Sequence, residues 1–278
     1  MPKAAQNPRG LRDPFEAFDP DRLDGRDPEV IRALLPVARA LCDRYFRLRV
    51  EGTEHIADGP ALYVGNHNNG IAGPESLCTL VTLWETRGPQ RPLYALAHDF
   101  AMRHLTPFGR ALQPFGALRA SPDNGRRALG MGAPVLVYPG GDLEAYRHFR
   151  RRDEVVLGDR AGFVRLAQET GTSIVPVVAE GAHRSALIVL EGREFARRIG
   201  LKRWARLECF PVALTLPWGV AVGPWLPYLP LPGSVRLRFL PPVRVALGDD
   251  PVAVCRGVQS TMQKALGEMA AQRRRPFP

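Results

Sequence analysis

The sequence predicts an α/β fold with a mostly parallel central sheet flanked by helices and an N-terminal helical arm. Short apolar runs alternate with helical stretches between residues 61 and 178, a pattern typical of βαβ units. The hydrophobic fraction of 45% and the length of 278 residues suit one globular core. We therefore expect residues 1–26 to form an irregular N-terminal arm and residues 27–278 to form a single domain.

The first helix is predicted to begin at residues 27–29, because an Asp that caps the helix is followed by Pro and Glu in the first turn. Pro36 is expected to kink this helix. Apolar residues recur at helical spacing along it, namely Ile31, Leu34, Leu35, Ala38, Leu41 and Tyr45. Such a stripe either packs on a sheet or lies in a membrane interface.

Strands are predicted in four apolar runs and helices in three stretches between or after them. The predicted strands are 61–65, 92–96, 134–138 and 173–178, and the predicted helices are 75–85, 124–131 and 161–170. Because parallel strands end at a common edge of a sheet, polar residues that follow them gather in one place. A last helix is predicted over about 251–272, before the basic residues Arg273, Arg274 and Arg275.

The segment 209–235 contains no charged residue over 27 positions, which is long enough for a transmembrane helix. Its prolines would break such a helix repeatedly. They are Pro211, Pro217, Pro224, Pro227, Pro230 and Pro232. Trp218, Trp225 and Tyr228 favour a bilayer interface. We expect a hairpin or loop that does not span the membrane but dips into lipid or lines an acyl pocket, with a buried proline-rich connection as the alternative.

The charge and the cysteines indicate the kind of partner and compartment. A net charge of +10 suits an anionic partner such as a phosphate or an acidic membrane face. No RNA-binding aromatic motif or zinc-finger spacing is present, so nucleic acid is not the expected partner. Four scattered cysteines and an N-terminus without an apolar signal core predict a cytosolic protein or one bound to the cytoplasmic side of a membrane.

His67 is the first candidate catalytic residue because it lies just after the strand predicted at 61–65. An imidazole with an unperturbed pKa of about 6.5 can take a proton from a hydroxyl near neutral pH. A carboxylate on the far ring nitrogen would fix the tautomer, and Glu75 is the nearest following carboxylate. The alternative is a structural histidine and an acid that favours the helix dipole.

Three further segments supply candidate binding residues. Tyr138 ends the strand predicted at 134–138, and Gly140 and Gly141 follow it. Glycines there let the backbone approach a phosphate or an oxyanion. Arg119 ends a short apolar run, and a guanidinium can hold a phosphate through two hydrogen bonds. Arg184, which follows the fourth strand, is a weaker candidate of the same kind.

In order and spacing, these segments together resemble the lysophospholipid acyltransferase superfamily over about residues 50–245. The family's first block, Asn-His followed by a spaced acid, is similar to Asn66-His67 with Glu75. Its later blocks are similar to 115–119, 138–141 and 174–178. The Pro-Gly-Gly form and the segment 160–167 look like the mono- and diacylglycerol acyltransferase-like branch.

The resemblance implies a glycerolipid acyltransferase-like fold without a metal or a cofactor. The implied donor is acyl-CoA or acyl carrier protein, a co-substrate, and the implied acceptor is a hydroxyl of a glycerolipid or lysophospholipid at a membrane surface. His67 would be the general base and Glu75 would orient it. Tyr138, Gly140 and Gly141 would hold the donor or the oxyanion, and Arg119 or Arg184 an acceptor phosphate. Membrane association would be peripheral or monotopic.

One departure from the family's pattern leaves two alternative functions open. The family's acid usually follows the histidine by five positions, where this chain has Ala72, whereas Glu75 follows by eight. A non-catalytic lipid-binding protein on the same fold is therefore the main alternative. A lipid or ester hydrolase is the third, although the sequence contains no GxSxG nucleophile motif.

Overall fold

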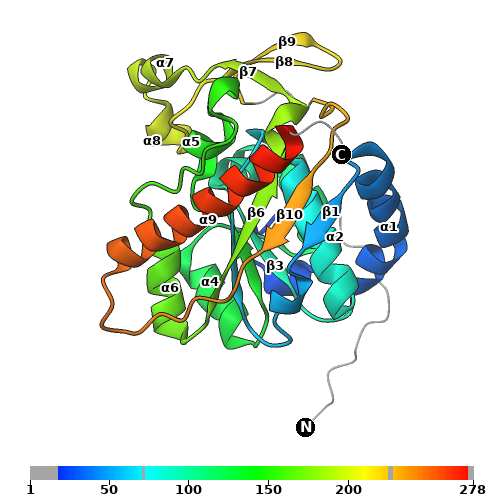
Figure 1. Cartoon of the computed structure of the whole chain (residues 1–278), viewed down its shortest axis with the longest axis vertical. Helices are drawn as coiled ribbons and strands as arrows, with labels where there is room; N and C mark the ends of the chain where they lie inside the picture. The colour runs from blue at the N-terminus through cyan, green and yellow to red at the C-terminus, as the bar shows by residue number, and fades with distance from the viewer. Residues whose placement is uncertain (1–17, 71–72, 225–227, 275–278) are drawn as a thin grey trace.

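The computed structural model describes residues 18–70, 73–224 and 228–274, and its described part is built around a seven-stranded sheet (Figure 1). The strand order is β1-β10-β6-β2-β5-β3-β4. From β6 to β4, neighbouring strands pair in parallel. β10 is antiparallel to β6, and β1 pairs in parallel with β10. The predicted mostly parallel sheet flanked by helices is therefore confirmed.

The strands of this sheet are short, and the helices connect or cover them. The strands are β1 (Arg49–Glu51), β2 (Leu62–Gly65), β3 (Tyr94–Ala97), β4 (Ala117–Arg119), β5 (Val135–Val137), β6 (Ile174–Glu180) and β10 (Arg236–Phe239). The helices are α1 (Pro28–Ala40), α2 (Pro74–Arg87), α3 (Thr106–Leu112), α4 (Pro122–Gly130), α5 (Gly141–Ala145), α6 (Gly162–Thr170), α7 (Arg193–Arg198), α8 (Leu201–Ala205) and α9 (Pro251–Arg274).

The central strands bury both faces, because alternate residues point to opposite sides of a sheet. Leu62 and Val64 of β2 face a core that α4, α6 and α9 cover. Tyr63, between them, faces a second core that α1 and α2 cover. Figure 1 shows these two helical layers on opposite sides of the sheet. Burial on both faces explains why the strands read as continuous apolar runs.

The start of the described chain packs onto the sheet. Leu23 is buried in the first core. The Asp27 side chain accepts hydrogen bonds from the N–H groups of Glu29 and Val30, so it caps α1 as expected. α1 continues through Pro36 and is followed by a π-helical turn, Leu41–Tyr45. Of the predicted apolar stripe, one part packs in the second core, namely Ile31, Leu35, Ala38 and Tyr45, and another part is exposed, namely Leu34 and Leu41.

A second, three-stranded antiparallel sheet lies beyond one end of the central sheet (Figure 1). It consists of β7 (Leu187–Leu190), β8 (Val212–Thr215) and β9 (Gly219–Val222). β8 and β9 form a hairpin in the segment where the sequence predicts a hairpin or loop. Trp225, one of the aromatic residues of that prediction, lies outside the described residues, as do residues 1–17 and Arg275.

Two further predictions concern the membrane and the cysteines. None of the helices within the described ranges has both the length and the apolar character needed to cross a membrane. All four cysteines fall within those ranges, and each is a buried free thiol. Their burial is typical of free cysteines, which behave as small apolar residues.

Candidate active site

His67 and Glu75 meet at the edge of the sheet where β2 ends and α2 begins. The Nδ1 atom of His67 lies 2.7 Å from Oε1 of Glu75. The same oxygen accepts the Asn68 N–H at 2.9 Å. The Glu75 side chain is fully buried, whereas the His67 side chain is 22% exposed. If Nδ1 carries the proton and donates it to Glu75, the other ring nitrogen is left as a base on a ring that a ligand can reach.

The loop between the two residues is longer than the resemblance implies, and its geometry accommodates the difference. Glu75 lies in the first turn of α2, where Pro74 occupies the first helical position. Its carboxylate turns back toward the end of β2 and meets His67 and Asn68 there. Ala72, which occupies the family's usual acid position, lies outside the described residues. A carboxylate thus reaches the imidazole from eight positions along the chain.

Tyr138 packs directly on the His67 ring. The two ring centroids are 5.0 Å apart, with an interplanar angle of 28°. The ring also passes close to β2, since a Cβ at Gly65 would lie 2.3 Å from Cε1 of Tyr138. Burial, and then the charge of Glu75, raises the pKa of the Tyr138 phenol. The sequence placed Tyr138 among the binding residues, and the structure places it against the candidate base.

Two buried charges hold the backbone of the His67 loop, and sequence reasoning missed both. The carboxylate of Glu144 accepts the His67 N–H at 2.7 Å and the Val156 N–H at 2.8 Å. Arg147, which is fully buried, donates to the carbonyl of His67 and to Oδ1 of Asn68, each at 2.7 Å. Burial raises the pKa of Glu144 to about 7, while the charge of Arg147 and the N–H groups act in the opposite direction.

Two asparagines tie the same loop to distant segments. The side chain of Asn66 exchanges two hydrogen bonds with the backbone of Ala179 in β6, at 3.0 and 2.7 Å. Asn69 donates to the hydroxyl of Ser185, and its carbonyl accepts the hydroxyl of Tyr228 at 2.6 Å. Asn69 has a φ of 61°, a left-handed conformation that Asn tolerates better than most residues. The loop is therefore held from β6 and from the segment that follows β9.

Gly140 and Gly141 lie beside the loop at the start of α5, where the local space requires glycine. A Cβ at Gly140 would lie 2.3 Å from Oε2 of Glu144, and Gly141 has a φ of 53°. The Gly141 N–H donates to the Tyr138 carbonyl at 3.2 Å, so it is used within the turn. Arg160 donates to the Gly140 carbonyl at 2.9 Å. The two glycines therefore bring the backbone close to Glu144 and Arg160.

Arg119 and Arg184 have acidic partners within the chain. Arg119 donates to Asp21 through two hydrogen bonds, Nε to Oδ1 at 2.8 Å and Nη2 to Oδ2 at 2.7 Å. Arg184 lies 3.7 Å from Asp153 and 4.0 Å from Glu180. Neither arginine shares a hydrogen bond or an ion pair with His67 or Glu75 among the described contacts. The structure thus brings His67, Glu75, Tyr138, Gly140 and Gly141 together and leaves the two arginines outside that group.

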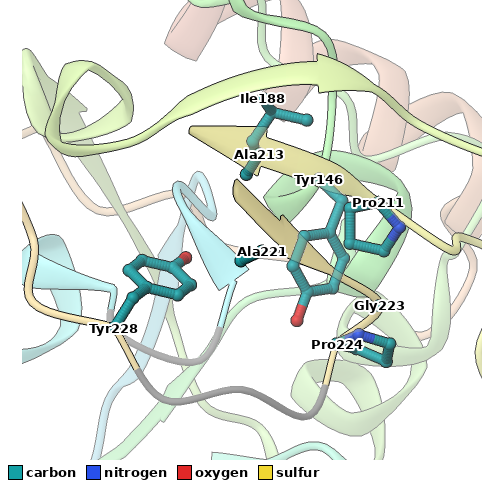
Figure 2. Close-up of a pocket in the computed structure, with 8 residues that line it drawn as sticks. All are labelled: Tyr146, Ile188, Pro211, Ala213, Ala221, Gly223, Pro224 and Tyr228. Carbon is teal, nitrogen blue, oxygen red and sulfur yellow. The ribbon is translucent and has the colours of Figure 1, made fainter. Parts of the chain in front are cut away.

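A small, mostly apolar pocket lies beneath the three-stranded sheet (Figure 2). Its lining residues are Tyr146, Ile188, Pro211, Ala213, Ala221, Gly223, Pro224 and Tyr228. Tyr228 and Tyr146 flank it, while Ile188, Ala213 and Ala221 come from the three strands. Both tyrosines also meet the His67 loop, since Tyr228 binds Asn69 and a Cβ at Gly70 would lie 2.4 Å from Cε1 of Tyr146. The pocket therefore adjoins the loop that carries the candidate base.

Comparison with known proteins shows that this part of the chain is similar to acyltransferases. The model of a family described as Acyltransferase matches residues 47–180, which include His67, Glu75 and the Tyr138 segment. The chain is 29% identical to an uncharacterized protein of Mycobacterium tuberculosis over 91% of this chain and 70% of that one. It is 31% identical to phytyl ester synthase 2 of Arabidopsis thaliana, over 50% of this chain and 20% of the plant protein.

The fold also has a counterpart among solved structures. The lysophosphatidate acyltransferase PlsC of Thermotoga maritima superposes with a TM-score of 0.51. The match covers 87% of this chain and 83% of that one, at 17% sequence identity. At this identity the likeness supports the shared fold of a mostly parallel sheet flanked by helices.

Proposed function

We propose that the chain, which matches the Acyltransferase family model over residues 47–180, transfers a fatty acyl group from a thioester donor to a hydroxyl of a glycerolipid or lysophospholipid acceptor. The donor is acyl-CoA or acyl carrier protein. The single observation that carries this proposal is the 2.7 Å contact between Nδ1 of His67 and the buried carboxylate of Glu75. A carboxylate in that position stabilises the imidazolium that forms when the ring takes up a proton.

The reaction needs one base and no covalent enzyme intermediate. The free nitrogen of His67 removes the proton from the acceptor hydroxyl, whose oxygen attacks the carbonyl carbon of the thioester. The tetrahedral intermediate collapses, the carbon–sulfur bond breaks, and the leaving thiolate takes the proton back from His67. The products are an ester and a free thiol. The Gly141 N–H binds the Tyr138 carbonyl, so other backbone groups near Gly140 and Gly141 hold the donor or the developing oxyanion. No metal or cofactor takes part.

The cationic residues of the chain bear on two further parts of the proposal, the acceptor and the location of the protein. Arg119, with Arg184 as the weaker candidate, binds the phosphate of an acceptor that carries one. Binding at Arg119 requires displacement of Asp21, which holds the guanidinium through two hydrogen bonds. The protein works at the cytoplasmic side of a membrane as a peripheral or monotopic protein, in line with its net charge of +10.

A direct assay distinguishes an acyltransferase from the main alternative, a non-catalytic lipid-binding protein. The purified full chain is incubated with radiolabelled acyl-CoA, or with acyl carrier protein loaded with the same chain, and with a panel of lysophospholipids, monoacylglycerol and diacylglycerol. We expect a radiolabelled ester from the native protein and none from His67→Ala. Binding without product would favour the lipid-binding protein, and release of free fatty acid without an acceptor would favour a hydrolase.

The control for His67→Ala is His55→Ala. His55 also lies near an acid, since its Nε2 is 3.9 Å from Glu54, but it belongs to the connection between β1 and β2. This variant should retain the native rate. An active His67→Ala protein with a native circular dichroism spectrum would contradict the proposed base.

A further inference from the structure

The sheet formed by β7, β8 and β9 is apolar on both of its faces, which is unusual for an antiparallel sheet at the edge of a protein. On the inner face, Ile188, Ala213 and Ala221 form a row across the three strands and line the pocket of Figure 2. The residues next to them in β8 and β9 point the other way. These are Val212, Leu214, Val220 and Val222.

The outer face of this sheet is exposed. Leu214, Val220 and Val222 are 43%, 56% and 47% exposed, and Leu214 pairs directly with Val220. Leu216 and Trp218, in the turn between β8 and β9, are about equally exposed. An antiparallel sheet with one solvated face normally carries polar residues there. Contiguous exposed apolar residues of this kind mark an interaction site.

The neighbouring helices extend the apolar area and add positive charge. Phe195, Ile199 and Trp204 of the segment α7–α8 are exposed. Figure 1 shows α7, α8 and the three-stranded sheet at the same end of the molecule. The segment 191–208 carries six exposed cationic side chains, five of which pair with one of four acids, Glu191, Glu194, Glu208 or Asp99. The cationic residues are Arg193, Arg197, Arg198, Lys202, Arg203 and Arg206.

The chemistry of this area fits a lipid bilayer better than a protein partner. Aliphatic side chains with tryptophans at their margin suit the boundary between acyl chains and headgroups. The excess of arginine suits anionic headgroups. The inner face of the same sheet lines a pocket whose residues Tyr146 and Tyr228 meet the His67 loop. The sheet therefore adjoins the loop that carries the candidate base.

We propose that this surface, made of the outer face of β8 and β9, their turn and the segment α7–α8, docks on an anionic lipid bilayer. The inference rests on the proposed function, because docking would bring the protein to the membrane that holds the lipid acceptor. A second exposed apolar stripe lies on α1 and contains Leu34, Val37 and Leu41, but we do not assign membrane docking to it. Docking through the sheet places the His67 loop near the membrane, with the pocket between them.

Vesicle binding tests the surface without any reaction. The full chain is sedimented with vesicles of equimolar phosphatidylcholine and phosphatidylglycerol, and with vesicles of phosphatidylcholine alone. We expect binding to the mixed vesicles that weakens with added salt. The double variant Val220→Asp/Val222→Asp should bind at least about tenfold more weakly, because removing even one buried Val from lipid costs that much. The variants Leu247→Asp and Leu34→Asp/Val37→Asp change exposed apolar residues elsewhere and should bind as the native protein does.

Each other outcome overturns the inference. Equal binding by the β9 double variant, or a loss confined to the α1 variant, would show that another surface meets the membrane. A native dimer in light scattering that dissociates in the β9 variant would assign the face to a second copy of the chain.

Activity on a detergent-dispersed substrate separates this inference from the proposed function. The β9 variant should keep the native rate there, because its substitutions point away from the pocket. A protein that binds vesicles as expected but makes no ester would contradict the proposed function. It would still support the docking surface.

Discussion

The carboxylate of Asp21 holds the guanidinium of Arg119 through two hydrogen bonds of 2.8 and 2.7 Å. Asp21 comes from the segment before α1, and Arg119 ends β4. Oδ1 of Asp21 also accepts from Asn124 at 2.6 Å, and the Arg119 guanidinium holds the pKa of Asp21 below its ordinary value. A carboxylate bound in this way occupies the donors that a phosphate would use. Asp21 and an acceptor phosphate therefore compete for Arg119.

Replacing Asp21 by Asn should favour acceptors that carry a phosphate. The variant removes the competing charge, so KM for a lysophosphatidate should fall about two- to fivefold, the range expected for a partly exposed ion pair. KM for monoacylglycerol, which has no phosphate, should not change. Initial rates with the two acceptors give both values. Asp123→Asn, which removes an exposed partner of Arg126, is the control. An unchanged ratio of the two KM values would mean that Arg119 does not meet the acceptor.

Replacing Glu75 by Gln should lower kcat with little effect on KM. An amide keeps the size of the side chain but does not stabilise an imidazolium, and the loss of an orienting acid costs up to about 10⁴ in rate. Single-turnover rates at saturating substrate measure this loss. Glu85→Gln makes the same chemical change at a half-exposed position near the other end of α2 and should leave kcat intact. Comparable rates for the two variants would remove Glu75 from the proposed mechanism.

Replacing Gly65 by Ala should destabilise the fold and displace the Tyr138 ring. The new Cβ would lie 2.3 Å from Cε1 of Tyr138, whose ring stacks on His67. Overpacking of this kind costs about 1–3 kcal/mol, which urea denaturation can measure. Gly59→Ala, where nothing lies within 4 Å of the added Cβ, is the matched control. We expect the second substitution Tyr138→Leu to restore stability but not activity. If Gly65→Ala behaves as Gly59→Ala does, the packing of Tyr138 against β2 is wrong.

The stability of the fold should depend on pH through Glu144. Burial raises its pKa from 4.5 to about 7. Between these two pH values the folded protein keeps a proton that the unfolded chain has released. The free energy of unfolding should therefore fall as the pH rises from about 4.5 to about 7, by at most about 3 kcal/mol, and then level off.

Chemical denaturation across this pH range tests the assignment to Glu144. Gln resembles the protonated form and does not titrate, so Glu144→Gln should have a flatter profile. Glu268→Gln, which removes an exposed acid paired with Arg238, should keep the native slope. A native slope in the Glu144→Gln protein would assign the titration to another group.

The sequence by itself determined the layered fold, because its signals are local. Four apolar runs and the stretches between them gave the central strands and α2, α4 and α6, since a strand buried on both faces requires a continuous apolar run. The Asp-Pro-Glu sequence also predicted the start of α1, and the prolines of the segment 209–235 predicted a hairpin or loop. The strands β1, β4 and β10 of the central sheet, and β7 of the three-stranded sheet, were missed, because each is short and bears weak periodicity.

The sequence also brought His67 and Glu75 together as a pair, because they are neighbours across one loop. Only the tertiary structure decided what surrounds that pair. Glu144 meets His67 across 77 residues, Asp21 meets Arg119 across 98, and Tyr228 meets Asn69 across 159. Local patterns carry no information on such contacts, because the packing of the sheet and its helices sets which distant side chains share a space. For the same reason, the tertiary structure gave Arg119 an acidic partner where the sequence predicted an open binding site.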